Sequence, residues 1–299
     1  MKKKWFSTVI IILMILAGLS LLLYPTVSNY LKTIAYKNAI YGFQRSVEAL
    51  DTKTYDDILA AAREYNANIA SREYIMLPLS DEDQAEYFRQ LNVPGTDVMG
   101  YVVIPKINAY LPIYHGTSDA VLQNGVGHLE GSSLPIGGEG AHTVLSGHRG
   151  LPSAMLFTKL DQLSEGDTFT VRVLREVLTY EVDQITTVRP DEAETLMFEP
   201  GEDYCTLVTC TPYSVNTHRL LVRGHRIPTP EEEHPSGPAS DTLPMEDQNI
   251  FGLFAELFLL TACAVAAFLA VIILVCVVRR RQNRRSEQTS RSDRDSQRR

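Results

Sequence analysis

Between residues 99 and 227 the chain consists of short apolar segments separated by turn residues, and this pattern limits the possible folds more than any other feature. From Met99 onward the hydrophobic period is close to two residues, which is typical of β-strands. Glycine and proline separate the segments at short intervals. Seven or eight short strands with little helix between them favour a mainly β fold, closed into a barrel. The expected strands cover residues 100–104, 111–114, 143–147, 168–174, 177–188, 206–210 and 219–225.

The stretch from 25 to 98 predicts helices instead. Apolar and aromatic side chains recur every three to four residues between 36 and 50, and again between 58 and 69. Leu77 and Pro78 interrupt this period. Ser80 is then followed by three acidic residues, which is typical of a helix N-terminus. We therefore expect an N-terminal helical segment that packs on the barrel.

Two long apolar segments flank this central part. Residues 5–24 form an uncharged run of 20 residues, enough to cross a hydrocarbon core of about 30 Å. Residues 250–278 contain only one charged residue, Glu256. Basic residues precede the first segment and follow the second, so the positive-inside rule predicts that both termini are cytoplasmic. A cleaved signal peptide is the alternative for the first segment.

These observations predict a multi-pass protein of the cell membrane with an extracellular catalytic domain. Residues 1–4 would be cytoplasmic and 5–24 a transmembrane helix or signal anchor, followed outside by the helical segment 25–98 and the barrel 99–227. The polar stretch 228–249, rich in proline, serine and acidic residues, is interpreted as a linker. Residues 250–278 would form the second transmembrane helix, and 279–299 a basic cytoplasmic tail.

The charge balance excludes some classes of partner. Acidic residues outnumber basic ones by 36 to 28, and the net charge is −8. The acidic excess is larger between 25 and 249, because many basic residues lie near the two ends. Nucleic-acid binding needs a basic surface, so it is not expected. The histidines lack metal-ligand spacing, so we expect neither a zinc site nor another cofactor.

Three residues together predict acyl transfer through a thioester. Cys210 ends an apolar strand, Arg219 opens the next strand, and His148 ends an earlier one. A cysteine thiolate is a strong nucleophile. The planar fork of an arginine suits an oxyanion, and a histidine can pass a proton to a leaving amine. His148 lies far upstream of the other two, so only a barrel can bring it to them.

Nearby residues of the same types are interpreted as structural. Cys205 and Cys210 are separated by an odd number of positions, so on one strand they point to opposite faces and cannot easily form a disulfide. Cys205 is then expected to be a small buried side chain. His218 adjoins Arg219 and faces the other way, whereas His142 is expected to contribute to packing.

The segments that carry this chemistry resemble sortases, the transpeptidases of Gram-positive cell surfaces, and the pilus-assembling class C in particular. The most specific match is TLVTCTPY at 206–213, followed by NTHRLLVRG at 216–224. Further matching segments are IPKI at 104–107, LPIYHGT at 111–117, GVGHL at 125–129, SLP at 133–135 and GHRGLP at 147–152. Together they span nearly the whole expected barrel.

The resemblance implies the eight-stranded sortase barrel, with Cys210 as nucleophile, His148 as the catalytic histidine and Arg219 as the arginine that opens the eighth strand. It implies cleavage of an LPxTG-like sorting signal between Thr and Gly, a thioester on the cysteine, and release to an amine. In class C this amine is typically a lysine of another pilin. The expected partners are therefore pilins or surface proteins with such signals, and a lysine-bearing pilin acceptor. A second membrane span after the barrel is also a class C trait.

Three alternatives follow from the same residues. A sortase that anchors surface proteins to the peptidoglycan cross-bridge would differ only in its acceptor. A non-catalytic surface scaffold or adhesin would not need the Cys210, His148 and Arg219 set. A papain-like protease would place its cysteine before its histidine in the chain.

Many class C enzymes also cover the cysteine with a lid that carries an Asp-Pro-aromatic tripeptide. This tripeptide does not occur before Met99, so the resemblance leaves open whether residues 77–92 form a lid.

Overall fold

The computed structural model describes residues 2–70, 79–190, 192 and 196–230. Of these, the residues from Tyr24 to 230 belong to one compact unit, and those before Tyr24 belong to another. Three helices come first, and a four-residue helix and two short 3-10 helices lie among the strands. The helices are α1 (Lys2–Glu48), α2 (Thr52–Ala70), α3 (Asp81–Tyr87) and α4 (Asp119–Leu122), with η1 (Pro105–Ile107) and η2 (Leu160–Gln162). The strands are β1 (Val98–Ile104), β2 (Ala109–His115), β3 (Val126–His128), β4 (Ala141–Ser146), β5 (Thr168–Val173), β6 (Glu176–Val188), β7 (Asp203–Thr211) and β8 (His218–Ile227).

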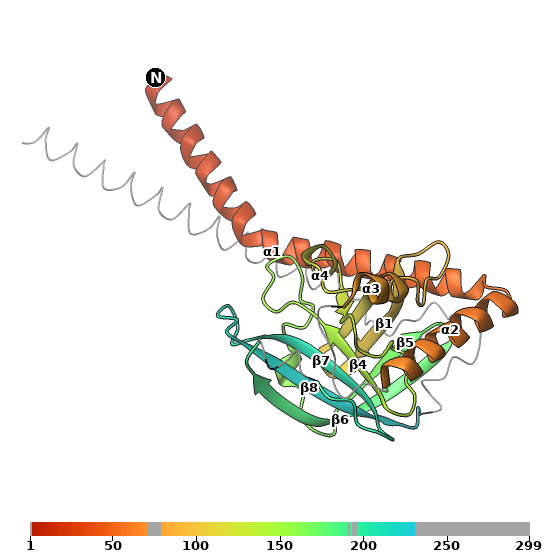
Figure 1. Cartoon of the computed structure of the whole chain (residues 1–299). Coiled ribbons are helices and arrows are strands. Elements are labelled where there is room, and N and C mark those ends of the chain that lie inside the picture. The colour runs from red at the N-terminus through yellow and green to blue at the C-terminus, as the bar shows by residue number, and fades with distance from the viewer. Residues whose placement is uncertain (1, 71–78, 191, 193–195, 231–299) are drawn as a thin grey trace, which may run out of the picture. The chain divides into compact units, whose positions relative to one another are not determined.

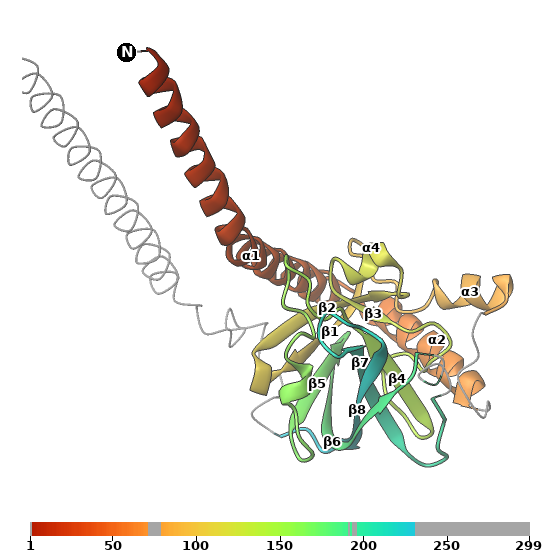
Figure 2. The same cartoon turned by 90° about the vertical axis from the view of Figure 1, so that its left-hand side faces the viewer.

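The strands close into a barrel in the order β1-β2-β3-β4-β7-β8-β6-β5 (Figures 1 and 2). The β2–β3 and β4–β7 pairs are parallel, and the other neighbouring pairs are antiparallel. The predicted mainly β fold with an eight-stranded barrel is therefore confirmed. The sequence did not predict β3, because a strand of three residues is too short to show a hydrophobic period.

The two faces of β7 have different surroundings. Cys205 pairs with Gly224 of β8, and a Cβ added at Gly224 would come within 2.8 Å of the Phe169 ring. Phe169 stacks on Tyr180, and both rings are fully buried, so this face of β7 and β8 points into the barrel. Side chains alternate along a strand. Cys210, five residues after Cys205, therefore lies on the outer face of the barrel wall.

The helices before the barrel bury one face each, as the periodic apolar residues predicted. In α1 the buried side chains follow the spacing of three to four residues, at Tyr36, Ile40, Phe43 and Val47. In α2, Asn66 is buried, and its side chain accepts a 2.7 Å hydrogen bond from the backbone NH of Leu134. This pairing fixes α2 beside the chain that leads into β4, and the N-terminal helical segment is confirmed.

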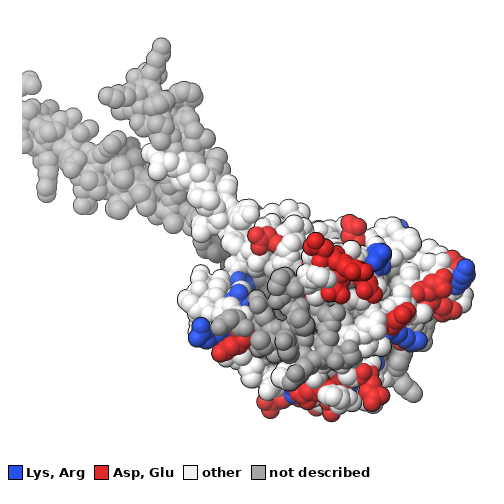
Figure 3. Space-filling view, viewed as in Figure 1, with Lys and Arg blue, Asp and Glu red and all other residues white. Residues whose placement is uncertain are grey.

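Helix α3 begins where the sequence predicted. The Ser80 side chain caps it by accepting a 3.1 Å hydrogen bond from the backbone NH of Asp83. Acidic residues Asp81, Glu82 and Asp83 fill its first turn, where they complement the positive end of the helix dipole. Acidic side chains gather over this helix on the molecular surface (Figure 3).

The predicted membrane topology is not supported. No helix within the described part of the chain is long and apolar enough to cross a membrane. The expected span 5–24 does not form an element of its own, because it is the first part of a 47-residue helix that continues through Lys32, Lys37 and Arg45. The prediction of a multi-pass membrane protein with two cytoplasmic ends is therefore wrong for this segment. The second expected span, 250–278, the tail 279–299 and most of the linker 228–249 lie outside the described residues.

Candidate active site

Cys210 and Arg219 lie directly opposite each other on β7 and β8. Residues in direct register across an antiparallel pair point to the same face, with Cβ atoms about 4.5–5.5 Å apart. Both side chains are half-buried, so each has one side packed on the barrel and one side open to solvent. The turn between them, residues 212–217, is exposed. The register therefore places a thiol and a guanidinium together at the end of the barrel wall.

His148 reaches the same place from the neighbouring strand. The β4–β7 pairing ends with Ser146 opposite Val208, and Gly147 extends it by donating a 3.0 Å hydrogen bond to the Val208 carbonyl. The Thr209 hydroxyl donates a 2.7 Å hydrogen bond to the Gly147 carbonyl. His148 is the residue after Gly147, just beyond the end of β4, and Cys210 is the residue after Thr209. The structure thus brings the three predicted site residues to adjacent strand ends.

Arg149 is a residue of this region that the sequence did not single out. Its guanidinium donates a 3.0 Å hydrogen bond to the hydroxyl of Thr211 and forms an ion pair with Asp161. The Arg149 side chain is only 8% exposed, and its buried Nε has no partner among the described residues. The residue after His148, Arg149, is therefore joined by a hydrogen bond to the residue after Cys210, Thr211. The Gly-His-Arg-Gly motif is visible in the sequence, but its long-range partner is not.

Two glycines beside His148 permit close packing. A Cβ added at Gly147 would come within 2.6 Å of the Phe157 ring, and Phe157 in turn donates a backbone hydrogen bond to the His148 carbonyl. Gly150 has a positive φ of 81°, and a Cβ there would meet the Tyr213 ring at 3.0 Å. The turn that follows Cys210 thus packs on the loop that follows His148.

The Arg219 guanidinium has few internal partners. It donates hydrogen bonds of 3.4 and 3.2 Å to the backbone carbonyls of Asn216 and His218. Within the described residues it makes no ion pair with a carboxylate. Several of its five donors therefore remain available for an oxyanion or a carbonyl oxygen.

The residues interpreted as structural have different surroundings. Cys205 is fully buried in the barrel, where burial raises the pKa of its thiol well above the usual range. Both domain cysteines are free. His142 is buried and hydrogen-bonded on both ring nitrogens, to the Met197 carbonyl and the Thr206 hydroxyl. His218 is exposed beside Thr217. In the described part of the chain, no group of three or more histidine, cysteine or acidic residues could hold a metal ion.

The segment 77–92, considered as a lid, lies only partly within the described residues. Its described part contains α3, in which Tyr87 is fully buried. The Tyr87 hydroxyl lies 2.9 Å from Nδ1 of His128 and accepts a 2.9 Å bond from the backbone NH of Gly116. His128 belongs to β3 and Gly116 directly follows β2, and no described hydrogen bond or ring contact joins Tyr87 to Cys210. Tyr87 is thus part of the packing of α3 on the barrel.

Comparison with known proteins agrees with this architecture. The family model described as the sortase domain matches residues 102–227. Sortase D of Bacillus subtilis strain 168 is 31% identical over 148 residues, covering 48% of this chain and 72% of that protein.

Solved structures agree as well. Sortase C1 of Streptococcus agalactiae is 52% identical, with a TM-score of 0.62. The match covers 64% of this chain and 100% of the sortase C1 chain. Sortase C of Streptococcus pneumoniae is 46% identical, with a TM-score of 0.58. The match covers 64% of this chain and 97% of the Streptococcus pneumoniae chain. The chain therefore belongs to the sortase family of cysteine transpeptidases, and its structural neighbours include class C members.

Proposed function

We propose that this sortase cleaves an LPxTG-like sorting signal between Thr and Gly, holds the acyl part as a thioester on Cys210, and transfers it to a lysine of a pilin. The observation that carries the proposal is the direct register of Cys210 with Arg219 beside the strand end that holds His148. The three chemical roles required for acyl transfer through a thioester are then available at adjacent strand ends: a nucleophile, an acid–base group and an oxyanion partner.

The first half-reaction forms the thioester. The thiolate of Cys210 attacks the carbonyl carbon of the signal's threonine, and the carbonyl oxygen becomes an oxyanion. Arg219, whose donors are not taken up by carboxylates, stabilises this charge. His148 donates a proton to the glycine nitrogen as the carbon–nitrogen bond breaks, and the fragment that begins with glycine leaves as an amine.

The second half-reaction uses the same groups in reverse. An uncharged lysine amine attacks the thioester carbon, and His148, now neutral, accepts its proton. The carbon–sulfur bond breaks, Cys210 leaves as a thiolate, and an isopeptide bond remains. Arg219 stabilises the second oxyanion as it did the first. No cofactor enters either step, because an acyl transfer between a thiol and an amine needs no net oxidation or reduction.

The choice of a pilin lysine as acceptor is supported by the class C neighbours. The structural report on the Streptococcus pneumoniae enzyme concerns pilin substrate specificity, and that enzyme covers 64% of this chain. The resemblance of the sequence to class C points the same way. Anchoring to a peptidoglycan cross-bridge amine would use identical chemistry at Cys210, so the acceptor has to be decided by assay.

The test incubates the full chain with an LPxTG peptide and two competing acceptors, a lysine-bearing pilin domain and a cross-bridge peptide. Mass spectrometry should detect an acyl-enzyme on Cys210 and an isopeptide product on the pilin domain. Exclusive transfer to the cross-bridge peptide would replace the pilin acceptor by a cell-wall acceptor. Absence of any acyl-enzyme, or full activity of Cys210→Ala, would exclude the mechanism.

A further inference from the structure

We propose that His142 and Arg223 form a clamp that fixes residues 197–199, in the connection between β6 and β7, against the outer barrel face that carries Cys210. The clamp positions residues 197–199 as one wall of the surface that binds the sorting signal. His142 and Arg223 are thus positioning residues rather than catalytic ones. The inference rests on the proposed function for the nature of the substrate, but the clamp itself is defined by contacts within the chain.

The clamp and Cys210 share one face of the sheet. His142 of β4 is in register with Tyr204 of β7, and Thr206 of β7 is in register with Arg223 of β8. Tyr204, Thr206 and Cys210 are separated by even numbers of residues, so their side chains point to the same side. Thr206 lies four residues before Cys210, which corresponds to roughly 13 Å along an extended strand. A bound peptide of a few residues can span that distance.

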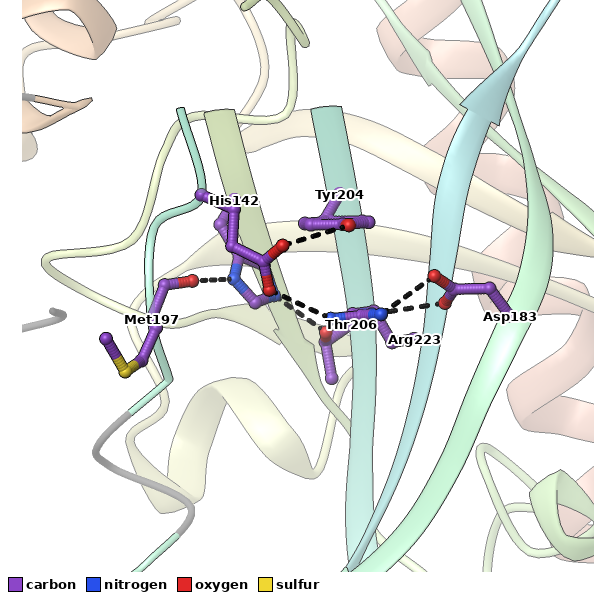
Figure 4. Close-up of polar contacts among 7 residues, drawn as sticks. His142, Asp183, Met197, Tyr204, Thr206 and Arg223 are labelled. Carbon is purple, nitrogen blue, oxygen red and sulfur yellow. Dashed lines mark hydrogen bonds and ion pairs between the residues drawn. The ribbon is translucent and has the colours of Figure 1, made fainter. Parts of the chain in front are cut away.

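Arg223 is the centre of the clamp (Figure 4). Its Nε and one terminal nitrogen donate bonds of 3.1 and 2.9 Å to the two carboxylate oxygens of Asp183. The other terminal nitrogen lies 3.4 Å from Glu199 in the connection. The guanidinium also lies 4.1 Å from the centroid of the Tyr204 ring, and the Tyr204 hydroxyl donates a 3.3 Å bond to Glu199. Glu199 is therefore held by two barrel residues.

The position of Asp183 depends on an irregularity of the sheet. The register between β6 and β8 shifts between Val182 and Gln184, so Asp183 is the extra residue of a β-bulge. A bulge redirects the side chain of the inserted residue. Here Asp183 meets Arg223 as a bidentate pair, which orients the guanidinium independently of Glu199. The barrel half of the clamp is thus complete without the connection.

His142 holds the same connection at a second point. One ring nitrogen, Nδ1, lies 2.6 Å from the backbone carbonyl of Met197, and Nε2 lies 2.8 Å from the Thr206 hydroxyl. A carbonyl can only accept, so Nδ1 carries the hydrogen. Burial lowers the pKa of His142, which keeps the ring neutral and leaves Nε2 as an acceptor for Thr206. Both ring nitrogens of this tautomer then have a hydrogen-bond partner.

The two halves of the clamp differ in exposure. His142 is 3% exposed and Thr206 1%, whereas Met197 is 53% exposed. The Glu199 side chain is 51% exposed, against 22% for Arg223. The Met197 side chain points away from His142 while its carbonyl is held (Figure 4). The clamp therefore holds Met197 by its backbone and leaves the Met197 side chain free to contact a ligand, which is how a wall of a binding site differs from core packing.

The test compares Glu199→Ala with Glu202→Ala in the full chain. Both residues are exposed acids of the same connection, but the Glu202 side chain makes no hydrogen bond within the described residues. With an LPxTG peptide, Glu199→Ala should raise KM about three- to tenfold and leave kcat within about twofold. The backbone amides of 196–202 should also exchange with deuterium faster. Glu202→Ala should change neither quantity.

A second pair of variants tests His142 without removing a buried polar group. The amide nitrogen of asparagine can replace Nδ1, whereas that of glutamine replaces Nε2. His142→Asn should therefore keep the bond to Met197 and a KM near that of the wild type, while His142→Gln should raise KM and amide exchange. Equal KM values for these two variants, or Glu199→Ala indistinguishable from Glu202→Ala, would overturn the clamp. If the wild type does not cleave the peptide, the proposed function fails, and amide exchange alone then decides whether the clamp exists.

Discussion

Strands β4, β7 and β8, with the residues that follow them, each carry two side chains of the same type in contrasting surroundings. The pairs are His142 and His148, Cys205 and Cys210, and Arg223 and Arg219. The first member of each pair is buried or tied to several partners, and the second is half-buried at a strand end. Residue type alone therefore does not distinguish a structural group from a reactive one, whereas burial and the number of internal partners do.

The arginines illustrate the difference most clearly, because they lie four residues apart on the same face of β8. Arg223 is bound by a bidentate carboxylate, a second carboxylate and an aromatic ring. Among the described residues, Arg219 donates hydrogen bonds only to backbone carbonyls, at 3.2 and 3.4 Å. A guanidinium whose donors are already used has little left for a substrate. The sheet thus keeps one arginine for its own architecture and leaves the other for chemistry.

The largest effect should separate the two cysteines. Cys210→Ala removes the nucleophile and should lower transfer of an LPxTG peptide by at least about a thousandfold. Cys205→Ala leaves a small cavity in the barrel and should cost about 1 kcal/mol of unfolding free energy, with activity retained. Peptide turnover and urea unfolding measure the two quantities. Loss of turnover in Cys205→Ala with a stable fold would reverse the assignment.

The next effect should separate the two arginines. Arg219→Ala removes an oxyanion donor and should reduce kcat/KM by about 10²–10³, with a change of less than about 0.5 kcal/mol in unfolding free energy. Arg223→Met leaves Asp183 without its partner and should cost about 1–3 kcal/mol of stability. Its kcat should remain close to that of the wild type. A large loss of kcat in Arg223→Met and little change in Arg219→Ala would break the comparison.

A smaller effect is expected at Arg149, which joins the strand ends of His148 and Cys210. Arg149→Met should lower kcat about tenfold, because small errors in the placement of catalytic groups slow the reaction. Thr211→Val removes the hydroxyl that accepts its bond and should act in the same direction. The double variant should be no slower than Arg149→Met alone, if both changes break one contact. Additive effects would show that the two residues act separately.

The sequence was sufficient for the barrel because hydrophobic period and turn residues are local signals. The sequence also predicted that Cys205 and Cys210 point to opposite faces of one strand, since alternation along a strand is a local rule. The bond from Arg149 to Thr211, and the pair formed by Asp183 and Arg223, join residues far apart in the chain. No local pattern indicates such partners, because strand order and register determine them. The β-bulge at Asp183 adds a single residue, which a period of two does not reveal.

The smallest effect concerns the histidines and appears as a pH dependence. Burial lowers the pKa of His142, so the folded protein favours the neutral ring. The unfolded chain binds a proton at this residue below about pH 6.5, so stability should decrease as the pH falls below that value. His142→Asn should reduce the slope by at most about 1.4 kcal/mol per pH unit.

Part of the slope should remain in this variant, because burial also lowers the pKa of His128, to about 4. Urea unfolding of the wild type and of His142→Asn between pH 5 and 8 measures the two slopes. If His142→Asn is as steep as the wild type over this range, the buried His142 is not a group whose protonation opposes folding, and the prediction fails.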